Sequence, residues 1–179
     1  KLYAIGGNGL SSVEIYDPQT GQWSAGPLLP SARYAVTAIT VGGKILVVGG
    51  RNSANQNINE VLELDPSTNQ WSQKAAMPST RHGMKLVLLE DKVWAIGGHD
   101  GYALNKVEIY DPVADSWTTG PSLTTARNWS SAWVANGRIY AAGGNDGSST
   151  YLNSIEFYDP ATNQWIAAGN LPESKYYAD

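Results

Sequence analysis

The segment IYAAGG at residues 139–144, followed by SIEFYDP at residues 154–160 and by Trp165, decides the fold because its pattern occurs four times in the chain. Gly-Gly pairs begin at residues 6, 49, 97 and 143, and Asp-Pro pairs begin at residues 17, 65, 111 and 159. A Trp follows each of these Asp residues by six positions, and a cation follows each Trp by ten, at Arg33, Arg81, Arg127 and Lys175. This self-similarity predicts a repeat architecture whose units stack on one another to bury a shared core.

Each repeat predicts four short β-strands. The first follows the cation, as in residues 34–40, and the second is the apolar run that ends on the Gly-Gly pair, as in residues 139–142. The third is the run at residues 13–16, 61–64, 107–110 and 155–158, and the fourth is centred on the Trp. β-Branched and aromatic residues dominate these runs and no Pro interrupts them. The apolar second strand indicates burial on both faces, as in a sheet packed between two neighbours.

The Asp-Pro segments predict tight turns between the third and fourth strands. In residues 17–21, Asp caps the turn, Pro presets φ, and Gly21 takes the left-handed position that ends it. Asn69, Asp115 and Asn163 stand at the equivalent position and also tolerate that conformation. The Gly-Gly pairs are expected where neighbouring units crowd and a side chain would not fit.

The Gly-Gly pair, the Glu-x-Tyr-Asp-Pro segment, the Trp and the Pro-x-x-Arg segment together resemble the kelch repeat. The resemblance covers essentially all of residues 1–179 and is nearest to the kelch domains of BTB-kelch ubiquitin-ligase adaptors and of related bacterial proteins. It implies an all-β kelch β-propeller, with four repeats of four-stranded antiparallel blades and an incomplete blade at the chain ends. One departure is Leu62, which stands where the other repeats carry Glu14, Glu108 and Glu156. We interpret these glutamates and the four cations as structural, joining loops through charge pairs or carbonyl contacts.

The phase of the repeats at the two ends leaves three arrangements open. Lys1 falls near the turn between a first and a second strand, and Asp179 falls within the beginning of a first strand. The chain is therefore expected to be part of a larger propeller, a four-blade ring nearly closed by its termini, or an open array completed by another copy. The first is favoured. An open array would leave blade edges available for self-association.

Composition disfavours several classes of function. A net charge of −4 argues against a nucleic-acid or anionic-membrane surface. The chain has no apolar run long enough to span a membrane. It has no Cys, which excludes disulfides, thiol chemistry and zinc–thiolate sites but does not fix the compartment. We expect no cofactor.

The loops at one end of each predicted blade differ between repeats, so they form the expected ligand-binding face. In kelch domains resembling the ubiquitin-ligase adaptors, the residue after the cation, the residue after Gly-Gly and the connection that follows line the peptide-binding face. These positions, with one aromatic outlier, give nine candidate ligand-binding residues: Tyr34, Arg51, His82, His99, Tyr102, Asn128, Trp129, Asn145 and Tyr151. Tyr, Asn and His suit polar peptides or sugars, whereas a single Arg disfavours an acidic peptide.

Trp129, the two histidines and residues 128–130 carry further predictions. Trp129 is large where the other repeats carry Ala35 and Gly83, so it either stacks on a ligand or fills a gap against the neighbouring blade. His82 and His99 are the only histidines, and because no third ligand is evident beyond Asp100 we predict no metal site. Residues 128–130 match the N-glycosylation acceptor pattern.

The predicted function is a non-catalytic binding module for a peptide, protein or carbohydrate. An enzyme is the alternative. Galactose-oxidase-like proteins use kelch blades but need a Tyr–Cys crosslink, which a chain without Cys cannot form. Bacterial kelch proteins that isomerise sialic acids would need acid–base groups, for which only His82, His99 and Asp100 are available. A structural, self-assembling array is the third possibility.

Overall fold

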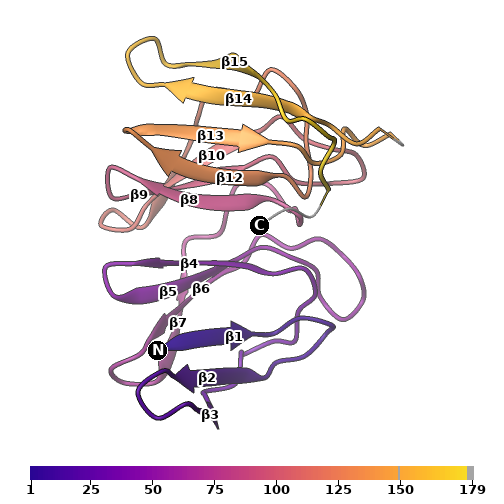
Figure 1. Cartoon of the computed structure of the whole chain (residues 1–179). Helices are drawn as coiled ribbons and strands as arrows, with labels where there is room; N and C mark the ends of the chain where they lie inside the picture. The colour runs from indigo at the N-terminus through magenta and orange to yellow at the C-terminus, as the bar shows by residue number, and fades with distance from the viewer. Residues whose placement is uncertain (149, 177–179) are drawn as a thin grey trace. The chain divides into compact units, whose positions relative to one another are not determined.

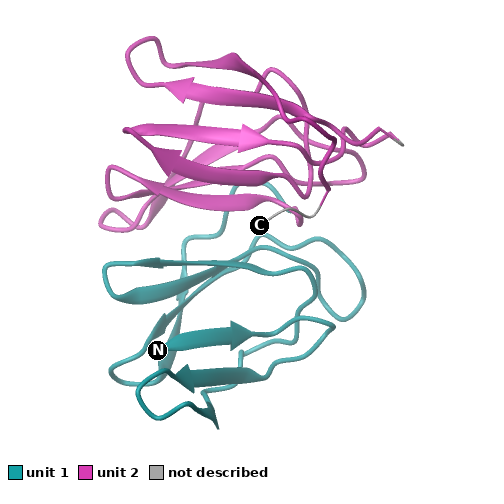
Figure 2. Cartoon of the chain, in the orientation of Figure 1, with its two compact units in different colours: residues 1–80 teal, residues 81–179 magenta. Residues whose placement is uncertain are grey.

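The computed structural model describes residues 1–148 and 150–176, and every regular element in them is a β-strand. The chain divides into two compact units, residues 1–80 and residues 81–179 (Figure 2). Each unit holds two antiparallel sheets (Figure 1). The all-β prediction is therefore confirmed. The described residues include no helix that could cross a membrane.

All four sheets are meanders in which strands adjacent in sequence pair with one another. The first unit contains the first sheet, β1 (Leu2–Ile5), β2 (Val13–Asp17) and β3 (Gln22–Ala25), and the second sheet, β4 (Thr37–Val41), β5 (Lys44–Val48), β6 (Val61–Asp65) and β7 (Gln70–Lys74). The second unit contains the third sheet, β8 (Lys85–Leu89), β9 (Lys92–Ile96), β10 (Val107–Asp111) and β11 (Ser116–Thr119), and the fourth sheet, β12 (Ser131–Ala135), β13 (Arg138–Ala142), β14 (Ser154–Asp159) and β15 (Gln164–Asn170). In the described residues the first sheet has three strands and the others have four, as the repeat phase predicted.

The first strand of each complete repeat begins later than predicted. Residues 34–40 were expected to form one strand, but β4 spans Thr37–Val41 and Tyr34 forms an isolated bridge with Arg51. Ala35, between them, has a φ of 48°. The equivalent residues Gly83 and Trp129 have φ values of 64° and 50°. A left-handed residue therefore separates the loop pairing from the strand in each of these repeats.

Neighbouring sheets within each unit share an apolar core. In the second unit, Val87, Leu89 and Trp94 of the third sheet pack with Ile139, Tyr158 and Trp165 of the fourth. The rings of Trp94 and Tyr158 lie 4.7 Å apart between centroids. In the first unit the shared core includes Val13, Leu29, Val47 and Leu62. These faces follow the period-two alternation of strands.

A Trp hydrogen bond joins the two sheets of each unit in the same way. Trp165 Nε1 donates to the carbonyl of Pro121 at 2.9 Å, and Trp71 Nε1 donates to the carbonyl of Pro27 at 3.0 Å. In both cases the acceptor lies 44 residues earlier in the chain. We refer to this contact as the Trp joint. It satisfies the indole N–H while the ring fills the space between sheets.

An arginine and a glutamate form a pin within the second, third and fourth sheets, which confirms the structural interpretation for Arg33, Arg81 and Arg127 and for Glu108 and Glu156. Arg127 is fully buried, and its Nη1 donates to the carbonyls of Gly143 at 2.8 Å and Ser154 at 3.3 Å. Its Nη2 donates to Glu156 Oε1 at 2.6 Å. The Glu156 carboxylate also accepts the backbone N–H groups of Thr124 and Thr125. The pin thus holds the loop at residues 124–127 against β14, the strand that carries Glu156.

The pin is present in the second repeat despite Leu62. Arg33 pairs with Glu60, which stands two residues before Leu62. In the third repeat Arg81 pairs with Glu108 at 3.2 Å. Burial lowers the pKa of Arg81 to about 10, against the opposing effect of the Glu108 and Asp100 carboxylates, so it remains charged at neutral pH. Lys175 differs, because its side chain is exposed and pairs with Glu173 at the surface.

The Asp-Pro turns have the predicted geometry. Asp111 Oδ1 accepts the backbone N–H groups of Val113 and Ala114 at 3.0 and 3.1 Å. The four residues that end the turns all have a positive φ: Gly21, Asn69, Asp115 and Asn163. Side chain and backbone together fix the register of the hairpin that the third and fourth strands of each repeat form.

We expect the turn at Asp111 to weaken in acid. The hydrogen bonds from Ala114 and Val113, in that order, hold the pKa of Asp111 below its ordinary value of 3.8. A carboxylate with a lowered pKa in the folded state stabilises the fold above its unfolded-state pKa, and that stability is lost as the pH falls toward the lowered value. Carbon-detected NMR titration of Asp111 should place its midpoint below 3.8. In Asp111→Asn, which keeps the side-chain acceptor, this contribution to the acid dependence of unfolding should disappear.

Candidate functional site

Backbone bridges bring the predicted loop residues together in pairs. His82 pairs with His99, Asn128 with Asn145, and Tyr34 with Arg51. Each pair exchanges two backbone hydrogen bonds, such as His99 N to His82 O at 2.8 Å and Asn128 N to Asn145 O at 2.9 Å. Six of the nine predicted residues are therefore held at equivalent positions by the main chain, whatever their side chains. This is how one scaffold presents different groups at each loop end.

A third segment completes each pair. Asn57 bridges to Arg51 and Tyr151 bridges to Asn145, each six residues further along the chain. In the third repeat the bridge to His99 comes from Ala103, so Tyr102 is not the counterpart of Tyr151. The connection there is two residues shorter than in the second and fourth repeats. Tyr102 lies in the same loop and is 69% exposed.

A row of aromatic rings crosses the loop ends of the third and fourth sheets. The His82 ring lies 5.2 Å from the His99 ring and 5.7 Å from the Trp129 ring, both edge to face. Trp129 N donates to the carbonyl of Gly83 at 2.7 Å, and a Cβ at Gly83 would approach the indole to 3.0 Å. Trp129 thus fills space against the neighbouring sheet, as one of its two predicted roles required. Its side chain is only partly buried, and stacking on a ligand stays a prediction.

Tyr34 occupies a comparable position in the first unit. Its ring lies against Gly9 so closely that a Cβ there would overlap it. Arg51, its partner, donates through Nε to Asn57 Oδ1 at 3.3 Å and through Nη1 to Asn55 Oδ1 at 3.1 Å. The guanidinium therefore shapes its own loop, which further reduces its availability to an acidic ligand.

Two predicted contact residues are buried. His82 and Asn128 are each 5% exposed, so they support the loop ends from beneath. Ser130 is 2% exposed as well. An acceptor asparagine must be accessible, so burial disfavours glycosylation of Asn128 in the folded chain. Asn128 Oδ1 is buried without a hydrogen-bond partner among the described residues, which is uncommon for a buried carbonyl oxygen.

A second aromatic pair lies on the loops of the fourth sheet. The rings of Tyr151 and Tyr176 are 5.0 Å apart, and these residues are 54% and 37% exposed. Tyr176 directly follows Lys175, at the position that Tyr34, His82 and Asn128 occupy in the other repeats. The Asn145 amide is engaged locally: its Nδ2 donates to the carbonyls of Ser148 and Thr150, and its Oδ1 accepts from Gly147. Asn145 therefore shapes the loop that carries Tyr151.

The histidines do not sit in a recognisable metal site. Across residues 1–148 and 150–176, no group of three His, Cys, Asp or Glu side chains is placed to hold a metal ion. His99 Nδ1 accepts the Gly101 N–H at 3.3 Å, which fixes that nitrogen as an acceptor.

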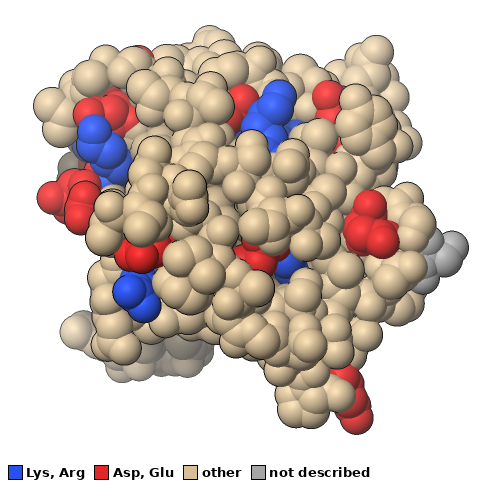
Figure 3. All heavy atoms as spheres, turned by 90° about the horizontal axis from the view of Figure 1, so that it is seen from above, with Lys and Arg blue, Asp and Glu red and all other residues tan. Residues whose placement is uncertain are grey.

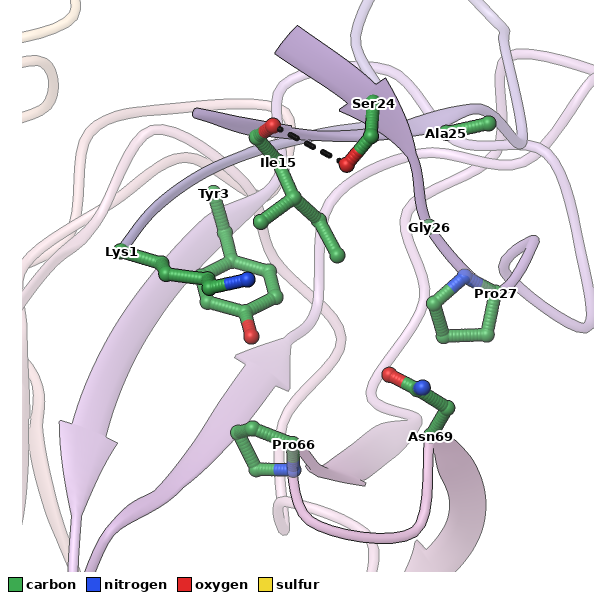
Figure 4. Close-up of a pocket in the computed structure, with 9 residues that line it drawn as sticks. All are labelled: Lys1, Tyr3, Ile15, Ser24, Ala25, Gly26, Pro27, Pro66 and Asn69. Carbon is green, nitrogen blue, oxygen red and sulfur yellow. Dashed lines mark hydrogen bonds between the residues drawn. The ribbon is translucent and has the colours of Figure 1, made fainter. Parts of the chain in front are cut away.

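Charged and hollow regions lie elsewhere on the surface. In the view of Figure 3, basic and acidic side chains are interspersed among uncharged ones. The first unit has a hollow of about 400 Å³ beside the Asp-Pro turn of the second sheet. Tyr3, Ile15, Pro27, Pro66 and Asn69 are among its lining residues (Figure 4). Its volume lies at the lower end of the range for ligand pockets.

Comparison with known proteins matches the repeats over nearly the whole chain. The model of the KLHDC2/KLHL20/DRC7 Kelch-repeats domain matches residues 1–175. The F-box/kelch-repeat protein At2g44630 of Arabidopsis thaliana is 40% identical over 67 residues, which is 36% of this chain and 18% of that protein. The Kelch domain-containing protein 7A of Mus musculus is 45% identical over 51 residues, which is 27% of this chain and 7% of that protein.

A solved structure gives the same architecture. The structure of YjhT superposes with a TM-score of 0.85 and 16% sequence identity, covering 97% of this chain and 64% of that one. A likeness at this identity speaks for the fold alone, and with the matched family model it shows the all-β propeller fold. The chain spans less than two thirds of this structure and a small part of the curated relatives. That it is part of a larger propeller stays a prediction.

Proposed function

Because the chain belongs to the kelch-repeat family, we propose that it is a non-catalytic binding module that takes an uncharged, polar peptide segment of a protein partner. The proposed site is the loop face of the second unit, defined by His99, Trp129, Tyr151 and Tyr176, with the buried His82 beneath them. The family's fold is consistent with an interaction role. The ligand class is our inference from the side chains at this face.

The observation that carries the proposal is the conformation of Trp129. A bulky residue with a φ of 50° costs on the order of 1–2 kcal/mol relative to an ordinary backbone. The equivalent position in the third repeat is Gly83, which adopts this conformation without strain. The chain thus keeps a large, partly buried indole in a strained backbone conformation, edge to face with His82. Rigid aromatic side chains of this kind are the usual anchors of protein interfaces.

The surrounding groups favour a polar, uncharged ligand. The rings of Tyr151 and Tyr176 lie 5.0 Å apart, and each carries a hydroxyl group that can donate or accept a hydrogen bond. A peptide N–H or a hydroxyl group can bind to these oxygens. Carbohydrate is the competing ligand class, because sugars also stack on aromatic rings and donate from their hydroxyl groups.

We expect Trp129→Gly to weaken binding of selected uncharged peptides by about tenfold or more, since it removes the anchor and keeps the backbone conformation. Peptide and glycan arrays, followed by titration calorimetry on the best binders, would measure this. Trp23→Ala is the matched control, because it removes an exposed indole from β3 and should leave affinity unchanged.

Two outcomes would contradict the proposal. Equal affinity of the wild type and Trp129→Gly would remove this indole from the site. Selective glycan binding, or catalysed interconversion of sialic acid forms followed by NMR, would favour the carbohydrate alternatives over a peptide-binding module.

A further inference from the structure

The turn between β12 and β13 is an exposed Asn-Gly pair in a left-handed conformation. Asn136 has a φ of 50° and Gly137 has a φ of 70°. The residues on either side, Ala135 and Arg138, pair with each other across the two strands. Two residues with positive φ match the twist of a tight hairpin, and Asn followed by Gly adopts this conformation readily. Both turn residues are exposed to solvent.

The side-chain amide of an Asn that precedes Gly can react with the main chain, because Gly has no side chain to hinder the approach. In this pair, the Gly137 nitrogen loses its proton and attacks Cγ of Asn136. The new N–Cγ bond closes a five-membered succinimide ring, the Cγ–Nδ2 bond breaks, and Nδ2 leaves as ammonia. Water then opens the ring at Cγ to give aspartate, or at the main-chain carbonyl carbon of residue 136 to give isoaspartate.

The surroundings of Gly137 leave its nitrogen open to this reaction. No described residue accepts a hydrogen bond from the Gly137 N–H, and a Cβ added to Gly137 would meet no atom within 4 Å. The turn can therefore rotate locally without breaking contacts made by Gly137. The equivalent turns of the second and third sheets are Gly42-Gly43 and Glu90-Asp91, which have no side-chain amide. Among these three hairpins, only the one in the fourth sheet carries the reacting group.

The other Asn-Gly pair of the chain, Asn8-Gly9, is held by its neighbours. The Gly9 N–H donates to the carbonyl of Arg33 at 3.2 Å, so the nitrogen that would attack Asn8 is already engaged. The Tyr34 ring also lies directly against Gly9 and opposes rotation of the main chain there. Arg33 is itself buried and paired with Glu60, which keeps its carbonyl in place. The same two residue types therefore meet opposite conditions at the two sites.

We propose that Asn136 is a site of spontaneous deamidation in the folded protein, whereas the fold protects Asn8. The modification requires only water, and it exchanges an amide for a carboxylate without oxidation or reduction. This inference goes beyond the binding role, because β12 separates the two positions: Trp129 lies just before its first residue, and Asn136 directly follows its last.

Both products change the end of the fourth sheet that carries the turn. Each adds a carboxylate, so the net charge of −4 becomes more negative by one unit. The new carboxylate lies two residues before Arg138, whose Nη2 is 3.7 Å from Asp159 Oδ1, and it competes for the same guanidinium. Isoaspartate also lengthens the main chain by one carbon within a two-residue turn, so the pairing of Ala135 with Arg138 should weaken. Amide hydrogen exchange of the separated isoaspartate form would measure this weakening.

Ageing the intact chain at mildly alkaline pH, both folded and in concentrated urea, tests the proposal. Alkaline pH favours loss of the proton from the attacking nitrogen, and peptide mapping by mass spectrometry separates aspartate and isoaspartate at each site. In the folded protein, the Asn136 peptide should convert several-fold faster than the Asn8 peptide. In urea, which removes the Gly9 hydrogen bond and the Tyr34 contact, the two peptides should convert at similar rates.

Two variants keep the test specific to Asn136. Asn136→Gly reproduces the Gly-Gly turn of the second sheet and removes the reacting carbon, so the acidic form that accumulates in the aged wild type should be absent on isoelectric focusing. Gly137→Ala should slow conversion, because its methyl group hinders the attacking nitrogen. The proposal is overturned if Asn8 converts as fast as Asn136 in the folded protein, or if Asn136 converts only in urea. An acidic form that persists in aged Asn136→Gly at the wild-type level would also overturn it.

Discussion

Arg127→Met should lower the free energy of unfolding by about 3–5 kcal/mol, the largest effect we expect from a single side chain. The substitution leaves Glu156, which is 2% exposed, as a buried carboxylate without its cation. It also removes the donors to the carbonyls of Gly143 and Ser154. Urea unfolding followed by Trp fluorescence would measure the change.

Two comparisons make this expectation specific to the pin. Arg33→Met should cost less, because the side chain of its partner Glu60 is 35% exposed and water can solvate the remaining charge. Neutralising the partner should rescue part of the loss, so Arg127→Met with Glu156→Gln should cost less than the sum of the two single changes. Equal losses for Arg33→Met and Arg127→Met would show that volume, and not the orphaned charge, dominates.

Gly97→Ala should cost about 3 kcal/mol or more, since two penalties coincide at this position. Gly97 has a φ of 64°, which strains any L-residue. A Cβ there would also overlap the carbonyl oxygen of Arg127, which the N–H of Gly98 holds in place at 2.9 Å. That oxygen belongs to the main chain entering the fourth sheet, so it cannot move aside without disturbing the pin.

Gly137→Ala is the matched control for Gly97→Ala. Gly137 has a φ of 70° but no neighbour within 4 Å of the added methyl group, so only the backbone strain applies. We expect a loss of about 1–2 kcal/mol there. Urea denaturation of the two variants side by side would isolate the cost of crowding. Losses of similar size would mean that the fourth sheet shifts to accommodate the methyl group.

The repeats allowed the sheets, turns and pins to be predicted, because these depend on spacing that four copies display together. The partner of Arg33 was harder to foresee. Leu62 occupies the usual glutamate position, and the carboxylate comes instead from Glu60. Residues two apart on an extended chain face the same side, so Glu60 could have been chosen from the sequence as the substitute.

The candidate site was predicted less completely, because exposure and local loop geometry do not follow from the repeat spacing. The position after the cation was correctly placed at the loop ends, yet His82 and Asn128 proved buried while Tyr34 is partly exposed. The bridge from Ala103 to His99 could not be foreseen, because the third connection is two residues shorter than its counterparts. One feature of the sequence indicated the left-handed φ of Trp129: the equivalent positions in two other repeats hold the small residues Ala35 and Gly83.

The Trp joint has a consequence for how such chains can change in length. The acceptor for Trp71 and Trp165 is a main-chain carbonyl, so recognition between consecutive sheets does not require a particular side chain on the receiving one. A duplicated repeat contains its own Trp, and the preceding repeat already contains the main-chain carbonyl that accepts the indole hydrogen bond. A whole repeat can therefore be gained or lost without paired substitutions where the new neighbours meet. A substitution within a pin, in contrast, requires a compensating substitution of its charged partner.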